Sequence, residues 1–85
     1  MKEIIIDCSL ISDAPALHRA LAEALAFPGW YGHNLDALHD CLTEISEDTQ
    51  LTLTHFDTLG AFGAGFRLVL NDAEDANLHL IVTIL

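Results

Sequence analysis

Two carboxylates, Asp36 and Asp40, stand four residues apart in a segment with helical periodicity. Side chains at this spacing lie one turn apart on the same face of a helix. Trp30 and Tyr31 come shortly before them, and aromatic side chains next to charge are typical of the anchors of protein interfaces. The pattern predicts a surface that suits a positively charged partner, above all a site made to hold phosphate.

The same residues also have a purely structural interpretation. Asp36 falls in the first turn of the expected helix, where the helix dipole favours negative charge, and Asp40 then lies on a solvated face. Trp30 and Tyr31 could be core residues, and a tyrosine can bury its ring while its hydroxyl faces solvent. Gly29 is expected, together with Gly32, to let this loop adopt unusual backbone angles.

Catalytic and metal chemistry fit these residues less well. Paired carboxylates of glycosidases usually come from different elements around a cleft, and one exposed helix makes a poor cleft. His33, Asp36, His39 and Asp40 could form a metal site, but His33 precedes the helix and His39 lies about 60° from Asp36 around it. Cys41 has no partner in His39, two residues away, for nucleophilic catalysis. We therefore predict a protein that is not an enzyme, with no metal or cofactor.

The composition narrows the class of partner. The chain has 85 residues, 52% of them apolar, which predicts one folded domain over residues 1–85. Thirteen acidic residues against three basic ones give a net charge of −10. This balance disfavours direct binding to nucleic acid and to anionic membranes, and it favours a basic protein. The alternative is that the acidic charge only keeps the protein soluble.

The start of the chain and its cysteines indicate the compartment. The apolar run Ile4–Ile6 is too short for a signal peptide, and no run is long enough to span a membrane. Cys8 and Cys41 match no zinc pattern and are expected to be reduced and partly buried. We therefore expect a complete cytoplasmic chain.

The first half of the chain predicts a strand and two helices. Residues 3–7 form an apolar run that predicts a strand buried on both faces. Ser12 or Asp13 can cap the next helix, which ends at the segment 27–29. Its apolar stripe consists of Leu17, Leu21 and Leu25, with Ala20 and Ala24 beside them.

Asn34 is the expected N-cap of the second helix. Its apolar face consists of Leu35, Leu38, Leu42 and Ile45, and its opposite, acidic face consists of Asp36, Asp40, Thr43 and Glu47.

The second half predicts two more strands around a third helix. Residues 50–54 alternate polar and apolar, which we interpret as an edge strand with one exposed face. A turn or short helix follows at residues 55–60, and Asn77 is the expected cap at the end of the third helix. The apolar run 78–85 predicts a buried strand. Strands joined through helices are usually parallel. The fold class is therefore α/β: a small three-stranded parallel sheet packed with three to four helices.

The segment Trp30–Thr43 resembles the barstar family of ribonuclease inhibitors. That family has an aromatic pair, a glycine, Asn-Leu-Asp-Ala-Leu, an aromatic residue and Asp-Cys-Leu-Thr at this place, against Trp30-Tyr31-Gly32, Asn34–Leu38 and His39–Thr43 here. The resemblance is strong over residues 15–45 and looser over the rest. It implies a barstar-like domain that acts as a cytoplasmic inhibitor of a basic, barnase-type, guanyl-specific microbial ribonuclease.

The resemblance also implies roles for individual residues. Asp40 would enter the phosphate site of the enzyme and accept hydrogen bonds from its arginines and histidine. Asp36 would pair with a basic residue on the rim. Tyr31 would pack against the catalytic histidine of the ribonuclease, and Trp30 would border the contact. The implied contact residues are Trp30, Tyr31, Gly32, Asn34, Leu35, Asp36, His39, Asp40, Thr43, Glu44 and Asp72.

Departures from the family pattern lie around the rim of this surface. His39 stands where the family has an aromatic ring, and Glu44 replaces a small residue. His33 replaces an acidic residue, and Asp72 takes the place of a family glutamate. These changes favour a ribonuclease with a rim different from that of barnase. The alternative function is an acidic adaptor that binds another basic protein without inhibiting a nuclease.

Overall fold

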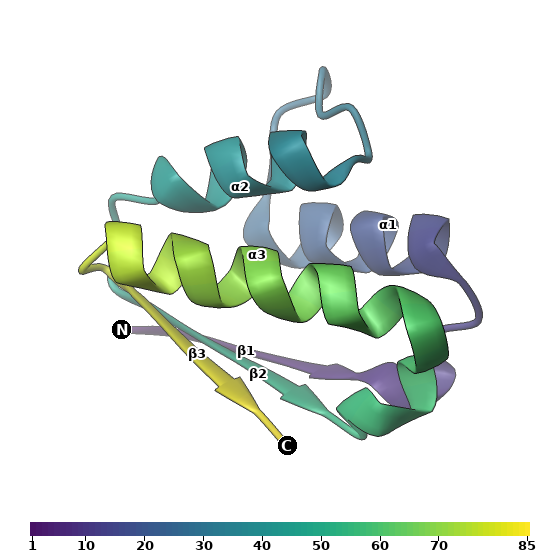
Figure 1. Cartoon of the computed structure of the whole chain (residues 1–85). Helices are drawn as coiled ribbons and strands as arrows, with labels where there is room; N and C mark the ends of the chain where they lie inside the picture. Colours follow the sequence, from purple (N-terminus) through teal and green to yellow (C-terminus); the bar gives the residue numbers. More distant parts are fainter.

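The computed structural model describes residues 1–85 and contains three strands, three α-helices and two 3-10 segments (Figure 1). In chain order these are β1 (Lys2–Asp7), a 3-10 segment (Cys8–Leu10), α1 (Ala14–Leu25), α2 (Leu35–Thr43), β2 (Thr49–Thr54), a 3-10 segment (Phe56–Phe62), α3 (Gly63–Ala76) and β3 (Leu80–Ile84). The predicted α/β class with a three-stranded parallel sheet is confirmed, and the α-helices number three. None of these helices has both the length and the apolarity needed to cross a bilayer.

The sheet has the strand order β1-β2-β3, and both pairs are parallel. In its middle row Ile4 of β1 lies beside Leu51 of β2, which lies beside Val82 of β3. The prediction that residues 50–54 form an edge strand was wrong, because β2 is the central strand. Its alternation arises from the two faces of the sheet: Leu51 and Leu53 are buried under the helices, whereas Thr52 and Thr54 alternate with them and face the other side.

All three helices lie on one face of the sheet, and the opposite face is open (Figure 1). Ile5 of β1 is 73% exposed and Ile81 of β3 is 44% exposed on this open face. The prediction that the first strand is buried on both faces was therefore wrong. The last strand, predicted to be buried, is fully buried only at Leu80. Parallel sheets usually carry helices on both faces, and a continuous apolar run cannot show that one of those layers is absent.

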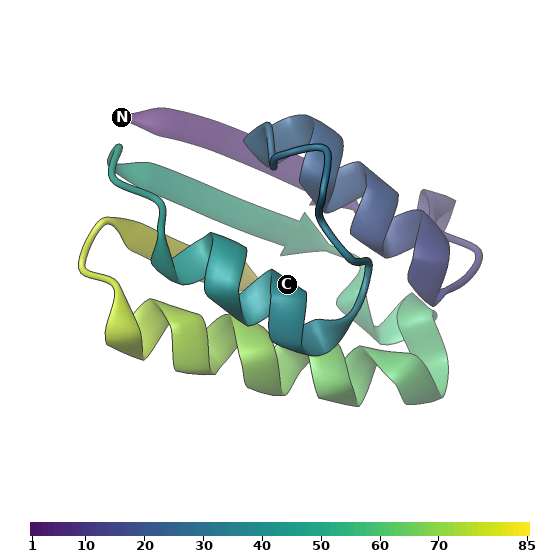
Figure 2. The same cartoon turned by 90° about the horizontal axis from the view of Figure 1, so that it is seen from above.

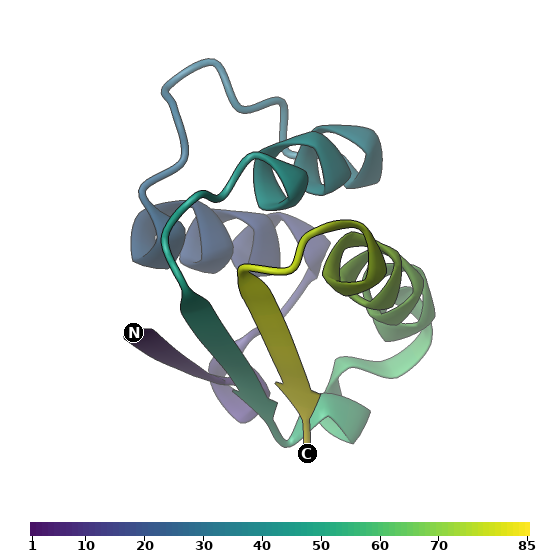
Figure 3. The same ribbon diagram turned by 90° about the vertical axis from the view of Figure 1, so that its left-hand side faces the viewer.

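The helices form two levels above the sheet, and α2 lies farther from the strands than α1 and α3 (Figure 3). Leu38 and Leu42 of α2 are fully buried, as are Leu17 and Leu21 of α1. Full burial of a leucine side chain stabilises the fold by about 1.5–3 kcal/mol. These side chains therefore hold α2 on the body of the protein and leave its outer face free.

Side-chain caps define where the first two helices begin. The Asp13 carboxylate accepts a hydrogen bond from the backbone N–H of Ala16 at 2.9 Å, and the Asn34 side-chain oxygen accepts one from Ala37 at 2.8 Å. Of the two residues predicted to cap α1, the cap is Asp13, and the cap at Asn34 is confirmed. Each such cap contributes about 1 kcal/mol.

The end of α2 is capped by Asn77, the residue that follows α3. Asn77 follows α3 as its predicted cap, and its side-chain N–H groups donate to the carbonyls of Leu42 and Ile45, both at 2.9 Å. Because α2 stops at Thr43, Ile45 and Glu47 lie beyond it, although the periodicity placed them on its faces. Asn77 therefore joins α3 to the segment that leaves α2.

The 3-10 segment that precedes α3 is bent at Gly60. The backbone of Gly60 has φ 72° and ψ −146°, a conformation that is essentially limited to glycine. This bend divides residues 56–62 into two short turns, where the sequence predicted a turn or short helix at residues 55–60. Phe56 and Leu59 are buried on its inner side and connect it to the core.

Candidate functional site

The outer face of α2 presents the two carboxylates to solvent. Asp36 and Asp40 are both exposed, on the helix that faces the viewer in Figure 2. Neither carboxylate takes part in an ion pair or a side-chain hydrogen bond within the chain. Both are therefore available to a partner. Thr43, at the end of the same helix, uses its hydroxyl to donate to the carbonyls of His39 and Asp40 at 3.0 and 3.1 Å.

The aromatic pair before α2 is divided between solvent and core. Trp30 is 69% exposed, whereas Tyr31 is only 6% exposed. The Tyr31 hydroxyl lies 2.5 Å from Nδ1 of His18, a buried residue of α1. Of the two interpretations, core packing therefore holds for Tyr31, whose hydroxyl does not face solvent, whereas most of Trp30 is exposed. The loop turns at this point, with the Tyr31 N–H donating to the Pro28 carbonyl at 3.0 Å.

The Tyr31 ring lies in a cluster of rings that anchors the loop. Its centroid lies 5.0 Å from that of Phe27, 5.2 Å from that of His33 and 5.7 Å from that of His18. Burial raises the pKa of Tyr31 to about 12, and burial together with the nearby His33 lowers the pKa of His18. Tyr31 therefore stays a neutral donor, and a neutral His18 can accept its hydrogen bond.

The unusual backbone angles of the loop occur at its two ends. Ala26 and His33 have φ values of 55° and 51°, whereas Gly29 and Gly32 do not have positive φ. The prediction that the two glycines supply these angles was therefore wrong. Gly32 is needed for space, because a Cβ atom there would lie 3.0 Å from Nδ2 of Asn34. That side chain caps α2 and donates to the Gly32 carbonyl at 3.3 Å.

The sequence matches a known family along nearly the whole chain. The family model described as "Barstar (barnase inhibitor)" matches residues 1–81. The chain belongs to the barstar family. A protein of Bacillus subtilis (strain 168) named "Putative ribonuclease inhibitor YrdF" is 36% identical over 80 residues, which cover 88% of each chain. The resemblance around α2 is thus one part of a relationship that includes β1, β2, all three helices and the start of β3.

The remaining residues implied by the barstar resemblance lie on or near α2. Leu35 and His39 are half-buried on the helix, and Glu44 is exposed directly after it. Asp72 is exposed on α3, the helix that packs against α2. The two helices come close at Gly65, where a Cβ atom would lie 3.0 Å from Cδ1 of Leu35. The candidate barstar-type surface therefore consists of the loop, α2 and a residue of α3.

The thiols and histidines of the chain do not form a reactive centre. Burial raises the pKa of both thiols, Cys8 and Cys41, so they remain protonated at neutral pH and are poor nucleophiles. No three His, Cys, Asp or Glu side chains are arranged to hold a metal ion. A pocket of about 280 Å³ lies beside the end of α2, between Phe27, Cys41 and Glu44. It therefore borders the candidate surface near Glu44.

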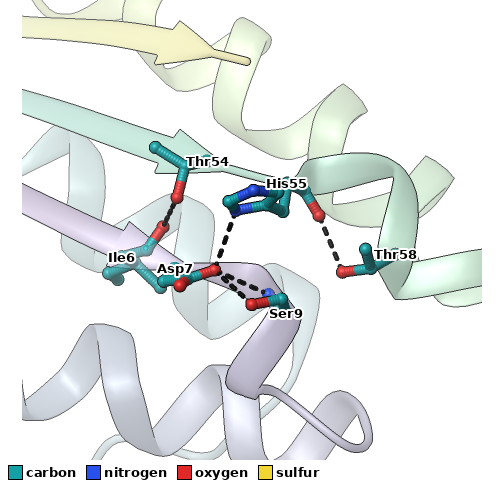
Figure 4. Close-up of polar contacts among 6 residues, drawn as sticks. All are labelled: Ile6, Asp7, Ser9, Thr54, His55 and Thr58. Atoms are coloured by element: carbon teal, nitrogen blue, oxygen red, sulfur yellow. Dashed lines mark hydrogen bonds and ion pairs between the residues drawn. The ribbon is translucent and has the colours of Figure 1, made fainter.

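A second polar cluster joins the carboxyl ends of β1 and β2 (Figure 4). The Asp7 carboxylate accepts hydrogen bonds from the Ser9 hydroxyl at 2.6 Å and the Ser9 N–H at 3.0 Å, and it lies 3.0 Å from Nδ1 of His55. The Ser9 bonds, followed by His55, lower the pKa of Asp7. Because Ser9 bonds the carboxylate and not the imidazole, the three residues do not form a nucleophilic triad. Asp7 and His55 are 48 residues apart, so no local motif indicated this contact.

Proposed function

We propose that this protein inhibits a small basic ribonuclease by inserting the carboxylates of α2 into the site that holds RNA phosphate. The observation that carries the proposal is the exposed, unpaired state of Asp36 and Asp40, one turn apart on the helix farthest from the sheet. Membership of the barstar family and the name of the B. subtilis relative support it. The inhibitor acts by occupying the active site, without a covalent step and in the cytoplasm.

Asp40 lies at the centre of this proposal. A carboxylate accepts paired N–H donors from an arginine in the same way as a phosphate does. It can therefore replace the phosphate of RNA among the arginines and histidine of a ribonuclease. Asp36, one turn earlier, pairs with a basic residue on the rim. The net charge of −10 complements a basic enzyme of the barnase type with guanyl specificity.

Trp30 replaces Tyr31 as the aromatic contact. Tyr31 is buried and its hydroxyl is bonded to His18, so it offers little surface to a partner. Trp30 is exposed on the same loop, beside the start of α2. We assign to Trp30 the packing against the catalytic histidine of the ribonuclease. His39, Thr43 and Glu44 complete the rim along α2.

Inhibition assays with Asp40→Ala and Glu47→Ala test the proposal. Removing one partner of a buried charge pair costs about 2–5 kcal/mol, a general range that includes measurements on the barnase–barstar pair. We therefore expect Asp40→Ala to raise the inhibition constant against a basic barnase-type ribonuclease by about 30- to 5,000-fold. Glu47→Ala removes another exposed carboxylate, beyond the end of α2. It should change the inhibition constant less than about five-fold.

Equal and small effects of the two substitutions would remove the role of Asp40. A tight complex that leaves the ribonuclease fully active would also contradict the proposal. That second outcome would indicate an acidic adaptor that uses the same helix.

A further inference from the structure

His18 connects the partner-binding loop to the body of the protein. It is buried on α1, and its Nδ1 lies 2.5 Å from the Tyr31 hydroxyl. Its ring packs against Phe66 of α3, with centroids 4.8 Å apart, and is stacked on His33 of the loop at 6.1 Å. The His18 ring of α1 therefore contacts α3 through Phe66 and the loop through Tyr31 and His33.

The contact depends on the protonation state of His18. A neutral imidazole has one bare nitrogen, which can accept the proton of the Tyr31 hydroxyl, whereas an imidazolium has N–H groups on both nitrogens. After protonation, the Nδ1–H of His18 can only donate to the oxygen of the Tyr31 hydroxyl, so the direction of the hydrogen bond reverses. The buried proton of the Tyr31 hydroxyl then loses its acceptor, and a buried donor without an acceptor destabilises the contact.

The groups around His18 do not offset a positive charge. Among the titratable groups only His33 acts on His18 through its charge, and it lowers the pKa of His18 in the same direction as burial does. Phe66, the neighbour from α3, does not titrate. On the far side of Tyr31 lies Cys41 of α2, whose raised thiol pKa leaves it uncharged at and below neutral pH. His18 thus titrates without a compensating carboxylate.

We propose that His18 is a positioning residue for the binding surface: when neutral it holds Tyr31 and with it the loop that presents Trp30, and its protonation releases this loop and weakens binding to the basic partner. The release of the loop is a property of the free protein. Only the loss of binding rests on the proposed ribonuclease inhibition.

Trp30 is the only tryptophan of the chain and reports on the loop directly. We expect its fluorescence anisotropy in the free protein to fall between pH 8 and pH 5, while the far-UV circular dichroism stays constant. His18→Asn keeps a neutral oxygen acceptor near the position of Nδ1 and does not titrate, so it should abolish the change. His33→Asn is the matched control, because asparagine tolerates the positive φ of this position. It should retain the transition.

The same transition in His18→Asn and in the unchanged protein would overturn the proposal. Tyr31→Phe provides a second test that does not depend on the stability of a substitution at position 18. It keeps the ring and removes the hydroxyl, so the anisotropy should be low at every pH. A pH-dependent transition that persists in Tyr31→Phe would also overturn the proposal.

Binding to a barnase-type ribonuclease over the same pH range tests the consequence for the partner. Groups of the ribonuclease titrate equally with both inhibitors, so the ratio of dissociation constants between the unchanged protein and His18→Asn isolates His18. We expect this ratio to rise below the titration midpoint and to level off at about 5- to 150-fold, the factor that one unmade buried hydrogen bond corresponds to. A constant ratio would refute the effect on binding. Loop release without binding to any ribonuclease would overturn the proposed inhibition and leave the loop mechanism supported.

Discussion

The two neighbouring aromatic residues Trp30 and Tyr31 differ in their surroundings. Trp30 exposes most of its ring beside the acidic face of α2, whereas Tyr31 directs its hydroxyl to His18 in the core. An exposed tryptophan contributes little to folding and can contribute strongly to a complex, because it loses its contact with water only on binding. The division leaves Trp30 free for the proposed contact, while Tyr31 supports the loop.

Alanine substitutions at these two positions should therefore have opposite effects. We expect Trp30→Ala to weaken binding to a basic ribonuclease by about ten-fold or more, with a change in the free energy of unfolding below about 0.5 kcal/mol. Tyr31→Ala should instead cost about 3–5 kcal/mol of stability, as other buried aromatic truncations do. Urea unfolding and an inhibition assay on both variants check this. Loss of stability on replacing Trp30 would contradict the assignment.

The pKa of Tyr31 makes a second prediction at the residue scale. Burial raises it to about 12 from an ordinary value of 10.0, so the folded state holds the phenolic proton more tightly than the unfolded chain does. Stability is then unaffected below pH 10 and falls as the pH rises from 10 to 12. Tyr31 is the only tyrosine, so its absorbance near 295 nm can be titrated directly. A native midpoint near 10, equal to that in urea, would contradict burial of the hydroxyl.

At the scale of elements, α2 is a short helix that depends on contacts at both of its ends. Asn34 caps its beginning, and Asn77, 35 residues after Leu42, bonds the carbonyls at its end. A nine-residue helix is marginal by itself in water. The two asparagines and the buried leucines of α2 therefore determine how firmly the carboxylates are held.

The two caps should differ in strength. Asn34→Ala removes one cap and should cost about 1 kcal/mol. Asn77→Ala removes the side-chain donor of both carbonyls and leaves Leu42 only its backbone donor, and we expect a cost of about 1–3 kcal/mol. Asn71→Ala, at an exposed position of α3, is the control and should be neutral or slightly stabilising because alanine favours helices. Urea midpoints rank the three, and equal costs for Asn71 and Asn77 would refute the role of Asn77.

At the scale of the whole molecule, we expect the strong negative charge to influence the rate of association with a basic partner. Thirteen acidic residues against three basic ones produce a field that reaches well beyond any single contact. Salt shortens this reach, because the Debye length is about 30 Å at 0.01 M and about 3 Å at 1 M. The charge therefore affects the rate of association more than the stability of the complex.

Association with a basic ribonuclease should slow by about ten-fold or more between low salt and 1 M salt. Asp36→Asn should reduce both the rate at low salt and its dependence on salt. Glu3→Gln removes the same charge from the open face of the sheet, away from α2, and should have a smaller effect. Stopped-flow measurements over a series of salt concentrations check this. An association rate that does not change with salt would show that the acidic surface does not steer binding.

The sequence by itself determined most elements of this protein and the exposed acidic face of α2 on which the proposed site lies. Helix caps at Asp13 and Asn34, the apolar stripe of α1 and the two faces of α2 depend on residues within a few positions of one another. Such local interactions produce a pattern that can be recognised in the amino-acid sequence. The family motif around Asp36 and Asp40 belongs to the same class, because a short continuous segment carries it.

The tertiary structure alone decided which strand is central, which face of the sheet is open and which aromatic residue is buried. Alternation in β2 is the same for an edge strand and for a central strand with one open face, so only the pairing with β1 along one edge and β3 along the other distinguishes them. Trp30 and Tyr31 differ because His18 of α1 accepts a hydrogen bond from the hydroxyl of Tyr31. These features depend on contacts between residues far apart in the chain, and no short pattern records such contacts.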